Sequence, residues 1–107
     1  MTKRDPKCSL YAKDYTAIQD IAFGSGGRLY VYELAVGGVP AFEANGETGP
    51  FPPAVLLQSS KARPGNRTEL AAGQLSQPGG VVVVNNDVYV TDNVFTPGGG
   101  RLIKIDN

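Results

Sequence analysis

The sequence of 107 residues contains no histidine, the side chain that most often serves as a general base near neutral pH. A Ser-His-Asp triad and a histidine-based metal site are therefore excluded. The single cysteine, Cys8, excludes an internal disulfide and a cysteine-rich zinc site. No pairing of a nucleophile with a base stands out among the other residues, so no catalytic residue is predicted.

Net charge and long apolar runs are also lacking. Ten Lys and Arg balance ten Asp and Glu, so the chain lacks the positive charge that binds a phosphate backbone, and we expect no nucleic-acid partner. The longest apolar runs, Val81 to Val84 among them, have only four residues and are far shorter than a membrane span, so we expect no membrane partner. The basic residues 1–8 have no apolar stretch behind them and do not resemble a secretory signal, which leaves the compartment unknown.

Glycine and proline, by contrast, are abundant: 14 Gly and 8 Pro together make 22 of the 107 residues. Short runs rich in Val, Leu, Ile and Tyr lie between these turn formers, which predicts an all-β fold. Residues 1–8 are polar and charged and predict a disordered tail. The eight predicted strands are 9–12, 20–23, 28–34, 54–59, 67–71, 81–84, 87–92 and 101–105.

The segments between these strands predict turns and one long loop. Gly24 to Gly27 predicts a β-hairpin, and Asn85-Asn86 predicts a tighter one. Residues 36–53 hold eight Gly and Pro, too many for a helix or a central strand, and predict a surface loop. The best helical candidate, Asp14 to Ile18, is too short to support a helix.

The chain resembles itself at an offset of 59 residues, which places Tyr30-Val31 on Tyr89-Val90 and Glu33 on Asp92. Further alignments place residues 9–12 on 68–71, 20–23 on 80–83 and 54–57 on 102–105. With the strands of one repeat labelled a to d, the chain reads d-abcd-abc. Four antiparallel strands form a blade of a β-propeller, and residues 9–12 would be a displaced outer strand that completes the last blade. An eight-stranded sandwich has the same strand count and stays open as an alternative, although the repeat favours the propeller.

Residues 20–33 read D-I-A-F-G-S-G-G-R-L-Y-V-Y-E and resemble a blade of the ScyD/ScyE family of propellers, which is related to NHL-repeat proteins. Residues 77–93 and 101–105 resemble the last blade of that family. The resemblance implies a ring of six or seven blades, of which this chain would hold a C-terminal pair, about 9–71 and 72–107. Similar motifs occur in gluconolactonase-like propellers, and full-length relatives are often exported.

Glu33 and Asp92 occupy matching positions after the Tyr-Val pairs and are the candidate metal-binding residues. Acidic side chains at blade ends could converge on a central channel and hold Ca²⁺, the one cofactor that the sequence suggests. Two carboxylates are too few for such a site, and the simpler interpretation is that each accepts hydrogen bonds from loop backbone.

The other residues with chemical potential have structural explanations. Gly24 to Gly27 precedes a strand instead of a helix, which indicates a turn and not a phosphate site. Asn66-Arg67-Thr68 matches a glycosylation sequon, and Cys8 lies in the polar tail; neither implies a function. Aromatic residues on stacked sheets usually pack between blades, and the residues expected to do so are Tyr30, Tyr32, Tyr89 and Phe95.

We therefore expect a non-catalytic propeller fragment that serves at most as a binding or interaction scaffold for an unknown ligand or protein. The alternatives are part of a metal-dependent gluconolactonase-like hydrolase and an unrelated β-sandwich binding domain. A blade pair leaves two apolar faces without neighbours, so a homotrimer that completes a six-bladed ring is a further expectation.

Overall fold

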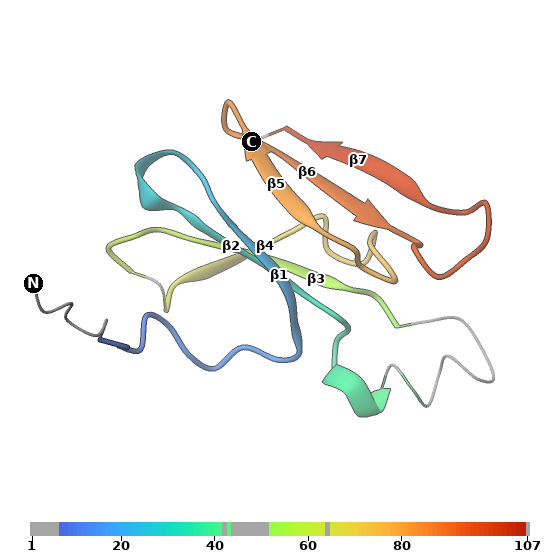
Figure 1. Cartoon of the computed structure of the whole chain (residues 1–107), viewed down its shortest axis with the longest axis horizontal. Coiled ribbons are helices and arrows are strands. Elements are labelled where there is room, and N and C mark those ends of the chain that lie inside the picture. The colour runs from blue at the N-terminus through green and yellow to red at the C-terminus, as the bar shows by residue number, and fades with distance from the viewer. Residues whose placement is uncertain (1–6, 42, 44–51, 64, 107) are drawn as a thin grey trace, which may run out of the picture.

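The computed structural model describes residues 7–41, 43, 52–63 and 65–106, and it confirms an all-β fold of two antiparallel sheets. The first sheet has the order β1-β2-β3-β4 and the second β5-β6-β7 (Figure 1). The strands are β1 (Ile18–Phe23), β2 (Leu29–Glu33), β3 (Val55–Ser59), β4 (Arg67–Leu70), β5 (Val81–Val84), β6 (Asp87–Asp92) and β7 (Arg101–Ile105). The two sheets do not close into a ring.

Two predicted hairpins are confirmed. Phe23 pairs with Leu29 across a short 3-10 turn, η1 (Ser25–Gly27), in which Gly26 and Gly27 adopt positive φ. That conformation is open to glycine without steric penalty. In the second hairpin Asn85 and Asn86 have φ of 50° and 72°. A two-residue hairpin turn of type I′ requires positive φ at both positions, which asparagine adopts more readily than most residues other than glycine.

The predicted strand at residues 9–12 is wrong, so the described chain has seven strands and the second sheet has no fourth one. The reason lies in contacts that tie the N-terminal segment to the first sheet. The Arg67 guanidinium donates hydrogen bonds to the carbonyls of Lys13 and Asp14, and the Tyr11 ring meets the Phe23 ring edge-on at 5.8 Å. Residues 9–12 consequently lie beside the first sheet and not along β7 (Figure 1).

Two smaller expectations concern helices. Residues 14–18 contain no helix, because Asp14 and Ala17 have positive φ and bend the chain before β1 begins. The loop at 36–53 does hold a helical turn at residues 38–41, which the count of Gly and Pro wrongly excluded. Pro40 lies within the first turn of this short segment, where a missing N–H removes no helical hydrogen bond. Much of the remaining loop, residues 42 and 44–51, lies outside the described residues, as do residues 1–6 of the predicted tail at 1–8.

The core lies between the two sheets. Tyr30 and Tyr32 on β2 and Leu56 on β3 form the inner face of the first sheet, and they cluster with Val88 and Val90 on β6. Leu75, in the connection between the sheets, is 1% exposed and closes one end of this cluster. All five residues of β2 are buried, as the apolar character of both its faces predicts.

The strand registers correct one detail of the sequence alignment. Glu33 pairs with Val55 and Asp92 pairs with Arg101, so Val55 corresponds to Arg101 when β2 is matched to β6. The alignment of 54–57 with 102–105 is therefore wrong by two residues, because the removed loop leaves nothing in the sequence that fixes the register. No helix in the described part of the chain is long and apolar enough to cross a membrane.

Candidate functional site

Glu33 ends β2 and anchors the N-terminal segment. Its side chain is buried, and Oε2 accepts a hydrogen bond of 2.7 Å from the backbone N–H of Thr16. The next residue, Leu34, donates its N–H to the carbonyl of Ala17 at 2.9 Å. Glu33 therefore accepts from loop backbone and holds residues 16 and 17 at the end of the first sheet.

Asp92 ends β6 and forms a bidentate ion pair with Arg101, its neighbour across the ladder. Asp92 Oδ1 accepts from Arg101 Nε at 2.9 Å and Oδ2 accepts from Nη2 at 2.6 Å. Asp92 is fully buried, whereas the Arg101 side chain is 52% exposed. The hydrogen bonds to Asp92, together with its charge, raise the pKa of the Arg101 guanidinium. Two parallel hydrogen bonds between a guanidinium and a carboxylate are the arrangement in which arginine binds a carboxylate most strongly.

Tyr32 connects this pair to the core. Its hydroxyl donates a hydrogen bond of 3.1 Å to the carbonyl of Thr91 on the other sheet. Burial raises the pKa of Tyr32 strongly; the nearby charge of Asp92 raises it further, and Arg101 lowers it in part. A phenol held neutral in this way is a hydrogen-bond donor between the two sheets, and no proton-transfer partner for it is evident among the described residues.

The structure gives each candidate metal ligand a protein partner: Thr16 N–H for Glu33 and Arg101 for Asp92. No group of three or more His, Cys, Asp or Glu side chains arranged to hold a metal ion occurs in the part of the chain that the structure describes. Ca²⁺ takes six to eight oxygen ligands, so the two carboxylates would need further donors.

The other residues that the sequence singled out occupy structural positions. Gly24 to Gly27 forms the hairpin turn, and Cys8 is exposed. Asn66 lies in the turn before β4 and donates its backbone N–H to Arg63 O at 3.0 Å. Tyr30 and Tyr32 are buried in the core, Tyr89 is half-buried, and Phe95 is 56% exposed.

Sequence reasoning missed two residues that connect separate parts of the fold. Asp20 Oδ2 accepts the N–H of Val81 at 2.9 Å, which joins β1 to β5 across the two sheets. Arg67 lies 3.6 Å over the Tyr15 ring while it donates to the backbone of residues 13 and 14. The signal for Asp20 was present, since a lone acid in the apolar run 20–23 needs a buried partner. Nothing in the sequence around Arg67 identifies its partners 53 and 54 positions away.

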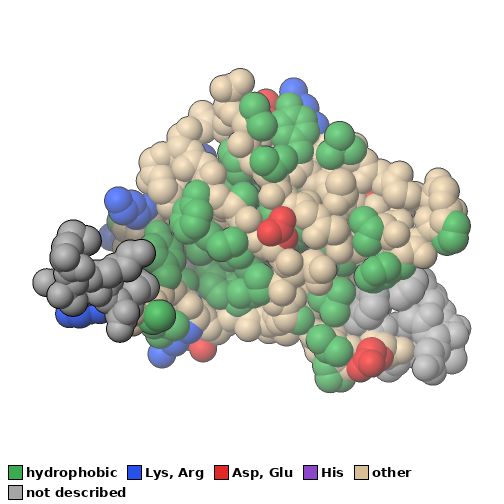
Figure 2. Space-filling view, viewed as in Figure 1, with side chains coloured by type: hydrophobic (Ala, Val, Ile, Leu, Met, Phe, Trp, Pro, Cys, Tyr) green, Lys and Arg blue, Asp and Glu red, His purple; other side chains and the backbone are tan. Residues whose placement is uncertain are grey.

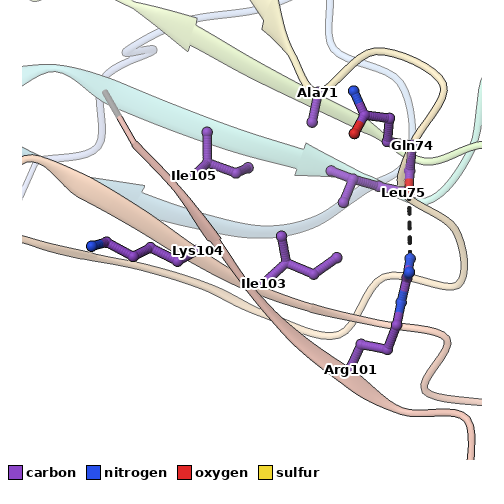
Figure 3. A pocket seen from close by; sticks show the side chains of 7 residues that line it. All are labelled: Ala71, Gln74, Leu75, Arg101, Ile103, Lys104 and Ile105. Carbon is purple, nitrogen blue, oxygen red and sulfur yellow. Dashed lines mark hydrogen bonds between the residues drawn. The ribbon is translucent and has the colours of Figure 1, made fainter.

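A cavity of about 470 Å³ lies beside β7. Figure 3 shows Ile103 and Ile105 of β7 lying opposite Ala71 and Leu75, with Arg101 at one end donating to the carbonyl of Gln74 at 3.5 Å. Lys104 lines it as well. The cavity borders the outer edge of β7, where no strand pairs within the described part of the chain.

Comparison of the sequence with protein-family models and with curated proteins finds no match.

Proposed function

We propose that this chain is a non-catalytic interaction scaffold built from two blades of a β-propeller of the ScyD/ScyE kind, and that copies of it assemble head to tail. The observation that carries the proposal is the way in which the two sheets stack. Each sheet presents a different face to the other, so one face of each kind is turned outward.

The strand registers identify which faces correspond. Tyr30 pairs with Ala22 and Gln58, and Tyr89 pairs with Val82 and Lys104, so these two tyrosines are counterparts. Tyr30 lies on the inner face of the first sheet, whereas Tyr89 alternates with the core residues Val88 and Val90 and lies on the far side of the second. Unlike faces therefore pack together, which is how consecutive blades of a propeller stack.

Both outward faces are apolar. On the first sheet it consists of Ile21, Phe23, Leu29 and Val31, which we call the outer face of the first sheet. Ile21 is 46% and Phe23 is 53% exposed, and hydrophobic side chains gather over β1 and β2 in Figure 2. On the second sheet it consists of Val82, Val84 and Leu102, which are 54%, 49% and 72% exposed.

Head-to-tail contacts between these two outer faces would repeat the stacking already present within one chain. Such a heterologous contact either closes into a ring or continues as a filament. Three copies would supply six blades, and a cyclic trimer is the closed assembly that we propose. The N-terminal residues Tyr11, Ala12 and Tyr15 lie against the outer face of the first sheet, and Tyr11 and Ala12 would move away from it to admit a neighbour.

The alternative functions receive less support. A gluconolactonase-like hydrolase needs a cluster of free oxygen ligands, and Glu33 and Asp92 are both engaged with other parts of the chain. An unrelated sandwich domain does not call for corresponding registers in both sheets, which these strand pairs have.

The mass of the purified chain in solution, measured by light scattering after size exclusion, tests the proposal. We expect a mass near three times 11.3 kDa. Val82→Asp places a charge on the outer face of the second sheet and should reduce the mass to that of a monomer without changing the circular dichroism. Thr68→Asp, on an exposed position of β4, is the matched control and should stay trimeric. A folded wild-type monomer at all concentrations would refute the assembly.

A further inference from the structure

We propose that the free edge of β7 is a strand-addition site, and that its occupant is the segment Ser9 to Ala12 of a second copy of this chain. This inference rests on the proposed head-to-tail assembly and names the contact that would lock each junction. Extended segments commonly bind by adding a strand to an open sheet edge, where backbone hydrogen bonds give affinity and side-chain pockets give specificity.

The two sheets differ at this edge. In the first sheet β4 pairs with β3, so that Leu70 lies opposite Leu56 and Arg67 lies opposite Ser59. Leu70 also packs against the core. In the second sheet β7 corresponds to β3, and no strand of the described chain occupies the place beside it. An unpaired row of backbone N–H and C=O groups is a template for another strand.

The cavity beside β7 supplies the side-chain pocket. Its walls carry Ile103 and Ile105 on one side and Ala71 and Leu75 on the other (Figure 3). A volume of about 470 Å³ accommodates a leucine-sized side chain together with the backbone that bears it. The pocket thus calls for an extended segment with an apolar residue directed inward.

Residues 9–12 have the complementary properties. They belong to no strand pair among the described residues, and Leu10 is 76% exposed, more than any other large apolar side chain in that part of the chain. At the offset of 59 residues they match Thr68 to Ala71, most of which is β4, the strand that fills this place in the first sheet.

Transfer of the β3–β4 register to β7 sets the new pairing. Leu57 pairs with Glu69 in the first sheet. Ile103 corresponds to Leu57 by the strand registers, and Leu10 corresponds to Glu69 by the offset of 59 residues. Leu10 would therefore lie opposite Ile103 and point into the cavity. Tyr11 would then lie opposite Leu102, whose side chain is 72% exposed. Both large apolar residues of the segment, Leu10 and Tyr11, would therefore meet apolar partners on β7.

The segment must come from a second copy. Arg67 holds the carbonyls of Lys13 and Asp14, and Glu33 holds the N–H of Thr16, all at the first sheet. The N-terminal segment and β7 lie on opposite sides of the molecule in Figure 1. Each copy thus offers one strand and one edge, and the pairing propagates head to tail in the same direction as the stacking of faces.

A pair of cysteines tests this contact. In a Cys8→Ser background, Ser9→Cys and Lys104→Cys place thiols opposite each other in the proposed register, and both positions are exposed or half-exposed. Under mild oxidation we expect disulfide-linked multimers or closed covalent rings on a non-reducing gel. The control variant pairs Ser9→Cys with Pro97→Cys, at an exposed position in the loop before β7. Multimers should form about tenfold faster in the first variant, because strand addition raises the local thiol concentration.

Equal rates in the two variants would overturn the proposal, and so would a monomer with an internal disulfide, which would show that the segment pairs with its own β7. Adding Leu10→Asp to the first variant should slow cross-linking to the control rate, whereas Lys7→Asp should not. A trimer by light scattering without selective cross-linking would refute strand addition while leaving the face-to-face assembly intact.

Discussion

Tyr32 is the residue whose replacement tests the contact between the two sheets most sharply. Its ring is fully buried, and its hydroxyl reaches the Thr91 carbonyl at 3.1 Å. Tyr32→Ala should lower the free energy of unfolding by about 4 kcal/mol, since it removes a large core side chain and leaves a cavity. Tyr32→Phe should lower it by about 1 kcal/mol, the net value of one hydrogen bond. The smaller value applies because the Thr91 carbonyl also accepts the N–H of Gly79 at 3.0 Å.

The same residue predicts a loss of stability at alkaline pH. Burial raises the pKa of Tyr32 above the ordinary tyrosine value, so between the two values the unfolded chain releases a proton that the folded chain retains. The free energy of unfolding should therefore fall as the pH rises above about 10. Tyr32→Phe removes this contribution, and the variant should lose less stability than the wild type over the same range.

Urea denaturation at fixed protein concentration, followed by far-UV circular dichroism because the chain has no tryptophan, measures both effects. Tyr89→Phe is the matched control, because it removes the same hydroxyl from a tyrosine that lies on the outer side of the second sheet and not in the core. It should change stability by less than about 0.5 kcal/mol. Equal losses for Tyr32→Phe and Tyr32→Ala would contradict the packing role of the Tyr32 ring, and identical alkaline profiles for wild type and Tyr32→Phe would contradict the raised pKa of its hydroxyl.

Three further replacements probe other contacts. Arg101→Met leaves the buried carboxylate of Asp92 without its partner and should lower the thermal midpoint measured by circular dichroism. Arg67→Ala releases the N-terminal segment and should speed trypsin cleavage after Lys13, as followed by mass spectrometry. Gly79→Ala brings a Cβ against Thr91 Oγ1 and within 2.9 Å of a Val94 methyl, and should lower the free energy of unfolding in urea by about 2 kcal/mol.

Each of these replacements has a matched control in the chain. Lys104→Met changes a side chain on the same strand that is also 52% exposed but pairs with accessible carboxylates, so its midpoint should move less than that of Arg101→Met. Arg63→Ala lies in an exposed turn and should leave the cleavage rate after Lys13 unchanged. Gly100→Ala meets no atom within 4 Å and should be near neutral. Equal effects within any pair would contradict the contact concerned.

Local patterns sufficed for the hairpins and failed where distant residues decide the conformation. Gly24 to Gly27 and Asn85-Asn86 dictate turns by their own backbone preferences, and the apolar runs beside them pair as predicted. Residues 9–12 have a strand-like pattern yet form none, because Arg67 and Phe23 hold the neighbouring residues beside the first sheet. No local feature of residues 9–14 encodes a partner more than fifty positions away.

The sequence predicted where the two candidate residues lie in the fold but not which groups they contact. Glu33 and Asp92 lie at the matching strand ends that the sequence offset indicates, but the partner of Asp92 is Arg101, which the register alone places opposite it. The alignment that could have shown this was displaced by two residues in β7. A two-residue shift preserves the alternation of faces, so the apolar pattern cannot detect it.

The stacking of unlike faces of the two sheets can be observed directly by NMR distances in the intact chain. We expect nuclear Overhauser contacts from the Tyr30 and Tyr32 rings to the methyl groups of Val88 and Val90, and none to the Tyr89 ring. Contacts between the Tyr30 and Tyr89 rings would show that corresponding faces pack together. That result would contradict both the stacking and the head-to-tail assembly derived from it.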